Sequence, residues 1–100
     1  MQLTLALLRK RGLECEITET FNPWSKTRKD LWGFVDILAL DPREGATIGV
    51  QCTSRSNASS HRKKILASPF YSSLKLCDWI ILLVTWAKVK NRWKAYEEQL

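Results

Sequence analysis

The first apolar positions of the chain recur at helical spacing. Leu3, Leu7 and Leu8 fall on one side of a helix, and Gly12 follows a run of basic residues. This pattern predicts an N-terminal helix that stops at the glycine, with cations near its negative end. Residues 14–20 then alternate between polar and apolar side chains. That alternation is typical of a half-exposed strand.

Three short runs further along predict the central strands. They are Gly33–Leu40, which is apolar except at Asp36, then Thr47–Thr53 and Asp78–Val84. The first run is so short and so apolar that it indicates a strand buried on both faces. The turn Asp41–Gly45 joins the first two runs, so we expect them to form a hairpin.

The remaining segments are more polar. Residues 22–29 are expected to form a loop, and a helix is predicted over Ala58–Ala67, ended by Pro69. Residues 70–76 fit a short helix, and Arg92–Glu97 fits an edge strand, with a helix as the alternative. The predicted order is α-β-β-β-α-β with a possible last strand. This is an α/β fold with a mixed central sheet flanked by helices.

Composition agrees with one folded domain over residues 1–100. Of the 100 residues, 45% are hydrophobic and 26% are charged, a balance that fits a globular domain rather than a disordered tail. No apolar run reaches the ~18 residues of a membrane span. The basic residues follow the apolar N-terminus, whereas a secretory signal has them before it. We therefore expect a cytoplasmic protein with no membrane partner.

The cysteines give no sign of cross-links. Cys15, Cys52 and Cys77 are odd in number and form no CxxC pair. A disulfide framework or a zinc site is therefore not expected. We interpret all three as small buried apolar residues in a reducing compartment.

Positive charge is spread unevenly along the chain. The net charge is +6, and residues 1–13 and 46–66 contain basic residues but no acidic ones. Such a local excess suits a polyanion such as nucleic acid. Solubility alone could also explain a basic protein.

Asp36 is the most informative residue for chemistry. An ionised carboxylate in an apolar strand costs several kcal/mol if it is left unpaired. A divalent metal or a structural Arg or Lys partner could compensate it. Strand side chains alternate, so Gln51 and Thr53 share one face of the next strand. Hairpin pairing can place these two polar groups beside Asp36.

The sequence here resembles the core of the PD-(D/E)xK nucleases. The resemblance lies in an Asp within GFVDILAL, then a hairpin, then VQCT and a basic helix, and it covers roughly Leu3 to Trp86. It is strongest for the Holliday-junction-resolvase-like branch and for small phage-encoded members. It implies a restriction-endonuclease-like core in which the second strand carries Asp and the third carries (D/E)-x-K.

The resemblance also implies a function. It points to a metal-dependent DNA endonuclease that uses Mg²⁺ or Mn²⁺ and acts on branched or structured DNA. Enzymes of this kind act as homodimers, because two strands must be cut symmetrically. The setting would be the cytoplasm of a bacterial or phage-infected cell.

Roles follow residue by residue from the same resemblance. Asp36 would bind the metal, Gln51 would occupy the (D/E) position and Thr53 the Lys position. The carbonyl of Cys52 would be the backbone ligand, so Asp36, Gln51 and Cys52 form the expected metal site. The chain departs from the family pattern because Gln51 is neutral and Thr53 is not a cation. A nuclease fold that binds DNA without cutting it is therefore the alternative.

Other residues could supply the missing groups. Lys63 or Lys64 on the basic helix could reach back over the sheet in place of the motif lysine, and Lys64 is the candidate catalytic cation. Glu14 or Glu16 could add a carboxylate. His61 could be a general base or a phosphate contact, although we prefer to interpret it as a surface helix residue.

Polar and basic residues on both sides of the expected site are candidates for binding nucleic acid. These residues are Lys26, Arg28, Lys29, Arg55, Asn57, Arg62 and Lys63. A solvated helix face would also explain each cluster alone. Trp24 and Trp32 could stack on a base or simply pack. A protein–protein adaptor with a Trp-rich surface is a third hypothesis.

Overall fold

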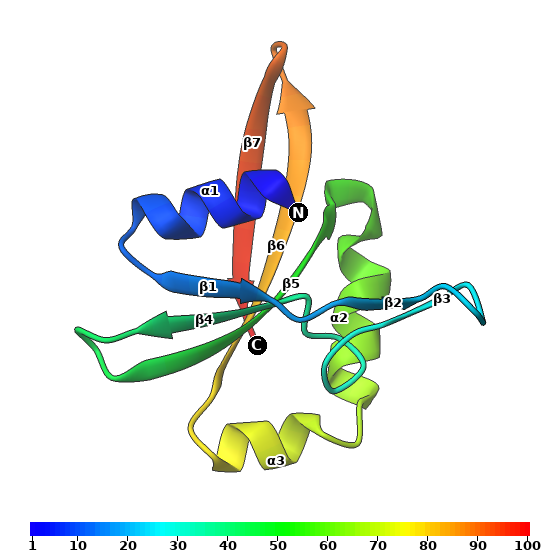
Figure 1. The fold of residues 1–100 in the computed structure, drawn as a ribbon. Coiled ribbons are helices and arrows are strands. Elements are labelled where there is room, and N and C mark those ends of the chain that lie inside the picture. The colour runs from blue at the N-terminus through cyan, green and yellow to red at the C-terminus, as the bar shows by residue number, and fades with distance from the viewer.

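A five-stranded mixed sheet forms the centre of the structure, which is a computed structural model of residues 1–100. The strand order is β1-β4-β5-β6-β7, and β5 and β6 are the parallel pair. The strands are β1 (Glu14–Ile17), β4 (Ile37–Asp41), β5 (Ala46–Ser54), β6 (Ile80–Val89) and β7 (Arg92–Gln99). Helix α1 (Gln2–Lys10) covers one face, and α2 (Ala58–Ala67) and α3 (Tyr71–Leu76) lie on the other side (Figure 1).

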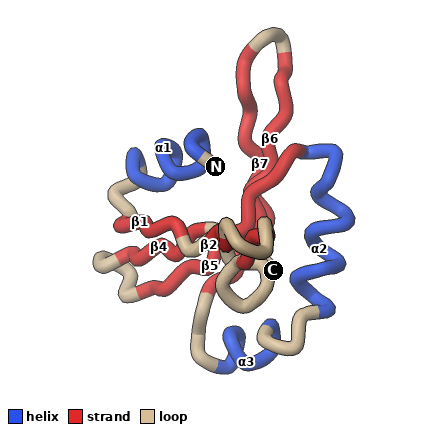
Figure 2. The backbone as a smooth tube through the Cα atoms, turned by 45° about the vertical axis from the view of Figure 1, so that its right-hand side comes forward, coloured by secondary structure: helices blue, strands red, loops and turns tan.

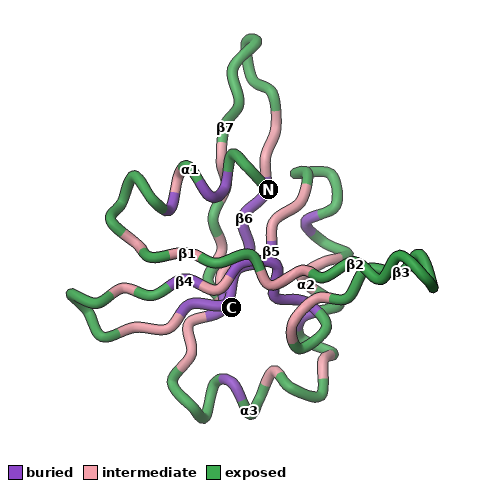
Figure 3. The backbone as a smooth tube through the Cα atoms, viewed as in Figure 1, coloured by how far each residue is buried: buried purple, intermediate pink, exposed green.

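Each face of the sheet has its own apolar core. Leu5 and Leu8 of α1 pack with a cluster that includes Val50. On the opposite face, Ile65 of α2 packs with a cluster that includes Leu83. Buried backbone positions gather along β4, β5 and β6 between these two layers (Figure 3). The central strands are apolar because both of their faces are covered.

Two ion pairs connect the helical layers to the edge strand. Arg11, just after α1, pairs with Glu97, and Arg62 of α2 forms a bidentate pair with Glu98 at 2.6 and 2.7 Å. Successive strand residues point to opposite faces, so the neighbouring acids Glu97 and Glu98 form their ion pairs on opposite faces of the sheet. This alternation fixes which β7 side chains share the α2 face.

Most of the predicted elements are confirmed. The N-terminal helix, the β4–β5 hairpin and the helix at Ala58–Ala67 are present, and residues 71–76 form the short helix. The edge strand after residue 91 is confirmed, so the helical alternative there is wrong. The structure is a mixed α/β fold whose central sheet is flanked by helices.

The predicted strand at Gly33–Leu40 starts later than expected. β4 begins at Ile37, because residues 31–35 form a turn closed by hydrogen bonds between Leu31 and Val35. Trp32 and Gly33 both have positive φ in this turn, at 58° and 82°, which no strand residue adopts. Asp36 therefore lies just before the strand rather than in its middle.

The region predicted as a loop over residues 22–29 also differs. Strands β2 (Thr20–Asn22) and β3 (Thr27–Lys29) form a separate two-stranded hairpin that extends away from the main sheet (Figure 1). The predicted strand over residues 14–20 is interrupted after Ile17. The break lies where Thr18 donates from its amide and its hydroxyl to the carbonyls of Asp36 and Val35.

The β6–β7 hairpin is longer than the sequence suggested. Its pairing continues to Val89 and Arg92, and the connecting residues Lys90 and Asn91 have φ of 51° and 64°. Two positive φ values are typical of the tight type I′ hairpin turn. The end of this hairpin projects beyond the rest of the molecule (Figures 1 and 2).

The remaining predictions concern cysteines and membranes. All three cysteines are free thiols, and Cys15 and Cys52 are half-buried. Cys77 is exposed, so the interpretation of all three as buried residues is wrong there. No helix is both long enough and apolar enough to cross a bilayer.

Candidate active site

Asp36 occupies the point where the β4–β5 ladder ends. The first pair of the ladder is Ile37 with Val50, while β5 continues to Ser54 without β4 beside it. The amide of Asp36 donates to the carbonyl of Val50 at 2.8 Å, and its carboxylate accepts the amide of Cys52 at 3.0 Å. The side chain thus caps the free edge of β5, with 6% of its surface exposed.

The surroundings of Asp36 disfavour its negative charge. Burial raises the pKa of the carboxyl to about 6, against the opposing hydrogen bond from Cys52. The neighbouring carboxylates of Asp30 and Glu19 raise the pKa further. Carboxylates this close compete for a proton or a cation. No Arg or Lys forms an ion pair with Asp36.

The turn before β4 brings Asp30 to this position. Asp30 follows β3, and the turn over residues 31–35 folds the chain back, so only those five residues separate two neighbouring acids. Trp32 in the left-handed region carries a backbone penalty of order 1 kcal/mol or more, of the kind that clusters at functional sites. Glu19 reaches the same place because Thr18 hydrogen-bonds to Val35 and Asp36.

Gln51 is a polar side chain in the core on the α2 face. It is 2% exposed and pairs across the sheet with Leu83 of the α2-side cluster. Its Oε1 atom has no hydrogen-bond partner, and neither do Oγ1 of Thr85 and Nδ1 of His61. A buried polar atom without a partner costs about 1–3 kcal/mol. Such a group is therefore a candidate to orient a ligand or water.

Lys64 provides the cation nearest to the acid pair. Its Nζ lies 3.9 Å from Oδ2 of Asp30, as expected if the basic helix reaches back over the sheet. Lys63, the other candidate, is exposed and forms no ion pair. Burial and Lys64 lower the pKa of His61, which also senses Asp30. Thr53 is half-buried beside Thr85 and adds no charge.

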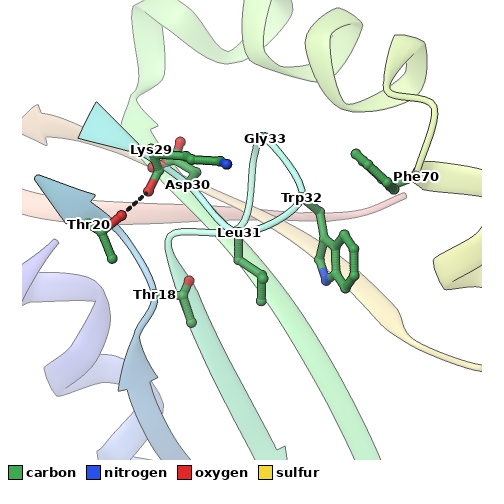
Figure 4. Close-up of a pocket in the computed structure, with 8 residues that line it drawn as sticks. All are labelled: Thr18, Thr20, Lys29, Asp30, Leu31, Trp32, Gly33 and Phe70. Carbon is green, nitrogen blue, oxygen red and sulfur yellow. Dashed lines mark hydrogen bonds between the residues drawn. The ribbon is translucent and has the colours of Figure 1, made fainter. Parts of the chain in front are cut away.

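A pocket of about 720 Å³ opens beside Asp30. Figure 4 shows Lys29 and Asp30 at one end, near Thr20, with Trp32 and Phe70 at the other. The two aromatic rings lie 5.0 Å apart and are tilted by 49°. The pocket therefore joins an apolar, aromatic end to a charged end next to the acids. Trp24, by contrast, is 94% exposed.

Some of the residues predicted to bind nucleic acid already have partners within the protein. Lys26 and Lys29 are exposed on the β2–β3 hairpin, where Arg28 pairs with Glu19 at 3.3 Å. Arg62 is held by Glu98. Arg55 lies over the ring of Tyr96 at 4.4 Å, and Asn57 donates to the hydroxyl of Ser54 at 3.0 Å. Near the acids the structure brings Arg28, through Glu19, and Lys29, which lines the pocket beside Asp30. Lys64 joins them through Asp30.

The oxygen donors can be compared with the needs of a metal ion. No group of three or more His, Cys, Asp or Glu side chains is arranged to hold a metal. Asp30, Asp36 and the unpartnered oxygen of Gln51 are oxygen donors. The N–H and C=O of one strand residue point to the same side, so the carbonyl of Cys52 also faces the gap beside Asp36. Mg²⁺ is commonly held by one or two carboxylates plus substrate phosphates, and this donor set fits that pattern.

Sequence reasoning missed two of the acids around Asp36. It considered Glu14 and Glu16, which are exposed and lie along β1 opposite Leu40 and Leu38. Asp30 and Glu19 are the carboxylates near Asp36 instead. The available signal for Asp30 was an acid directly before a Trp-Gly turn.

Comparison with known proteins identified no relative of the chain. No protein-family model matches the chain, and no match was found among the curated proteins or the solved structures.

Proposed function

We propose that the protein is a divalent-metal-dependent endonuclease that hydrolyses phosphodiester bonds in DNA. The supporting observation is the pair of carboxylates of Asp30 and Asp36 just before β4, with Nζ of Lys64 3.9 Å from Asp30. Two acids without a buried cationic partner, next to an exposed lysine, are suited to bind a metal ion and a phosphate.

The order of elements supports a specific fold for this activity. Leaving aside the β2–β3 hairpin, the short helix α3 and the last strand β7, the chain runs α1, β1, β4, β5, α2, β6. This α-β-β-β-α-β order is that of the restriction-endonuclease-like core of the PD-(D/E)xK nucleases. Asp36 precedes its second strand, and Gln51 to Thr53 lie on its third. We propose that the chain is a member of that superfamily, similar to its Holliday-junction-resolvase-like and small phage-encoded members.

The residues have distinct roles in this proposal. Asp36, Asp30 and the carbonyl of Cys52 would hold Mg²⁺ or Mn²⁺, and Oε1 of Gln51 would orient a water or another ligand. A divalent ion bound there supplies Lewis-acid polarisation of the phosphate and a more acidic water. Lys64 stabilises the negative charge that develops on the phosphate. It replaces the motif lysine that Thr53 cannot provide.

The substrate and assembly follow from the same proposal. Lys29 at the charged end of the pocket would contact the DNA backbone next to the cut phosphate. Cutting both strands of a branched DNA requires two such sites, so we propose a homodimer working in the cytoplasm. Both edge strands of the sheet, β1 and β7, are available for pairing between copies.

A second candidate is a nuclease fold that binds DNA without cutting it. The neutral Gln51 and the half-buried Thr53 favour it, since the site carries less charge for metal and phosphate than the family pattern provides. This form predicts DNA binding that depends on salt but needs no divalent metal.

Cleavage of supercoiled plasmid and of a four-way junction with Mn²⁺ or Mg²⁺ tests the proposal. Wild-type protein should cut, and Asp36→Asn should reduce the rate by at least ~100-fold, since metal ligands contribute several kcal/mol to transition-state stabilisation. Asp78→Asn is the matched control. Asp78 is exposed and has a φ of 63° that Asn also adopts readily.

Each outcome separates the candidates. Equal cutting by wild type and Asp36→Asn would exclude Asp36 from the chemistry. Binding in EDTA without any cutting would support the DNA-binding form. Failure to bind DNA at ~50 mM salt, where electrostatic binding is strong, would leave the adaptor hypothesis.

A further inference from the structure

The projecting end of the β6–β7 hairpin is unlike the rest of the surface. Residues 88–94 are all exposed, and their pairing is regular up to the turn at Lys90 and Asn91. The hairpin extends beyond both helical layers (Figures 1 and 2). It forms a two-stranded ribbon that is anchored in the sheet at one end and free at the other.

The charge of this ribbon has a single sign. It carries Lys88, Lys90, Arg92 and Lys94, and residues 87–94 contain no acid. None of these cations forms an ion pair within the protein. Lys88 lies over the ring of Trp93 at 5.6 Å, and Lys94 lies over Tyr96 at 5.0 Å. Free cations interleaved with aromatic rings are the composition expected of a nucleic-acid contact.

One face of the ribbon continues the face that carries the candidate site. Glu98 faces α2 through its pair with Arg62. Strand residues alternate, so Arg92, Lys94 and Tyr96 lie on that same face. Arg55, at 4.4 Å from the Tyr96 ring, extends the row toward α2. The row of cations therefore leads along β7 from the level of the site to the hairpin tip.

The sheet register gives the length of this row. Glu98 pairs with Leu83, and Leu83 pairs with Gln51, so Glu98 lies at the level of the candidate site. Arg92 is six residues further along β7. At about 3.4 Å per strand residue the row extends roughly 20 Å. This length matches about six base pairs of B-DNA, at 3.4 Å each.

We infer that the β6–β7 ribbon is a duplex-binding arm. Asp36 lies three strand spacings, or about 14 Å, across the sheet from β7, so its distance from Arg92 is about 25 Å. Arg92 and Lys94 then contact phosphates of double-stranded DNA about seven base pairs from the phosphate held near Asp36. The major groove of B-DNA admits a two-stranded β-ribbon, so the tip at Lys90 and Asn91 can enter it. The inference rests on the proposed function for the position of the cut phosphate. It adds a requirement for duplex DNA on one side of the cut.

The arm is tested by replacing Arg92→Gln and Lys94→Gln together. Affinity for a duplex of about two helical turns is measured in EDTA between ~50 and ~200 mM salt. We expect roughly 10-fold weaker binding and a salt-dependence slope smaller by about two, one for each lost phosphate contact. The matched control is Arg9→Gln with Lys10→Gln, which removes the same charge from the exposed end of α1. Far-ultraviolet circular dichroism and thermal melting of each variant show that the fold is retained.

The two proposals can fail separately. If the salt-dependence slope of the Arg92/Lys94 variant equals that of the control, the ribbon is not a DNA-binding arm, even if Mn²⁺-dependent cutting remains. A smaller slope in the double variant, with cutting restored at saturating protein, supports the arm as a binding element outside the chemistry. On duplexes that extend fewer than about seven base pairs from the cut on either side, the difference between variant and control should vanish. Tight binding of polyglutamate instead of duplex would overturn DNA as the occupant.

Discussion

The carboxyl of Asp36 destabilises the fold when it is ionised. Its pKa is raised to about 6, chiefly by burial, and the unfolded value is near 3.9. The folded state therefore binds the proton more tightly than the unfolded state does. The resulting stabilisation is fully present below about pH 3.9 and is lost as the pH rises through about 6. Functional sites commonly carry such a penalty.

Replacing Asp36→Asn should therefore stabilise the protein at pH 8. The amide keeps an oxygen acceptor for the Cys52 N–H and removes the buried charge. We expect a gain of up to about 3 kcal/mol in the free energy of unfolding at pH 8, shrinking as the pH approaches 4. Urea denaturation of both proteins at a series of pH values measures it. A variant less stable than wild type at pH 8 would show that Asp36 has a structural role.

At the scale of single residues, the sequence identified Asp36 but not its neighbours. Asp36 stands out because it is the only charged residue in an apolar run. Asp30 approaches it through a turn in which Trp32 has positive φ. No apolar pattern signals that conformation, because bulky residues rarely adopt it. Glu19 depends in the same way on a local break in β1.

At the scale of elements, helix α2 has one lysine aimed at the site. Lys64 lies 3.9 Å from Asp30, and its neighbour Lys63 is exposed without an ion pair. Adjacent helix positions point in different directions. Lys64 is therefore the candidate catalytic residue of this helix, and Lys63 is its matched control.

Lys64→Gln should slow cleavage by roughly 100-fold, the range found when one charge-stabilising group is removed. Lys63→Gln should leave the rate nearly unchanged. DNA affinity of the two variants should fall equally and slightly, since each loses one cation. Single-turnover cleavage and binding in EDTA measure these effects separately. Equal rates for both variants would remove Lys64 from the chemistry.

The sequence predicted the elements that have a strong apolar pattern, but it did not predict the elements whose formation depends on turns. The runs around β4, β5 and β6 identified the central sheet because a strand covered on both faces must be apolar. The polar β2–β3 hairpin has no buried face, as all of its strand residues are exposed. Its pairing depends on the turn around Lys26, whose φ is 54°.

At the scale of the whole molecule, net charge suggests a polyanionic partner but does not locate the surface that would bind it. The chain carries +6, and the sequence pointed to cations around the site. Arg28 and Arg62 instead pair with acids inside the protein. Four cations without an ion pair lie together on the β6–β7 ribbon, whose length and register became visible only in the folded chain.

The central claim is that the carboxylates of Asp30 and Asp36 bind a divalent cation. Titration of Mn²⁺ into the protein, followed by the paramagnetic resonance of free Mn²⁺, tests it most directly. The account predicts about one ion bound per chain in wild type and in Asp78→Asn, and loss of that ion in Asp36→Asn and Asp30→Asn. Binding of Mn²⁺ that is unchanged in both site variants, or absent from wild type with and without DNA, would contradict it.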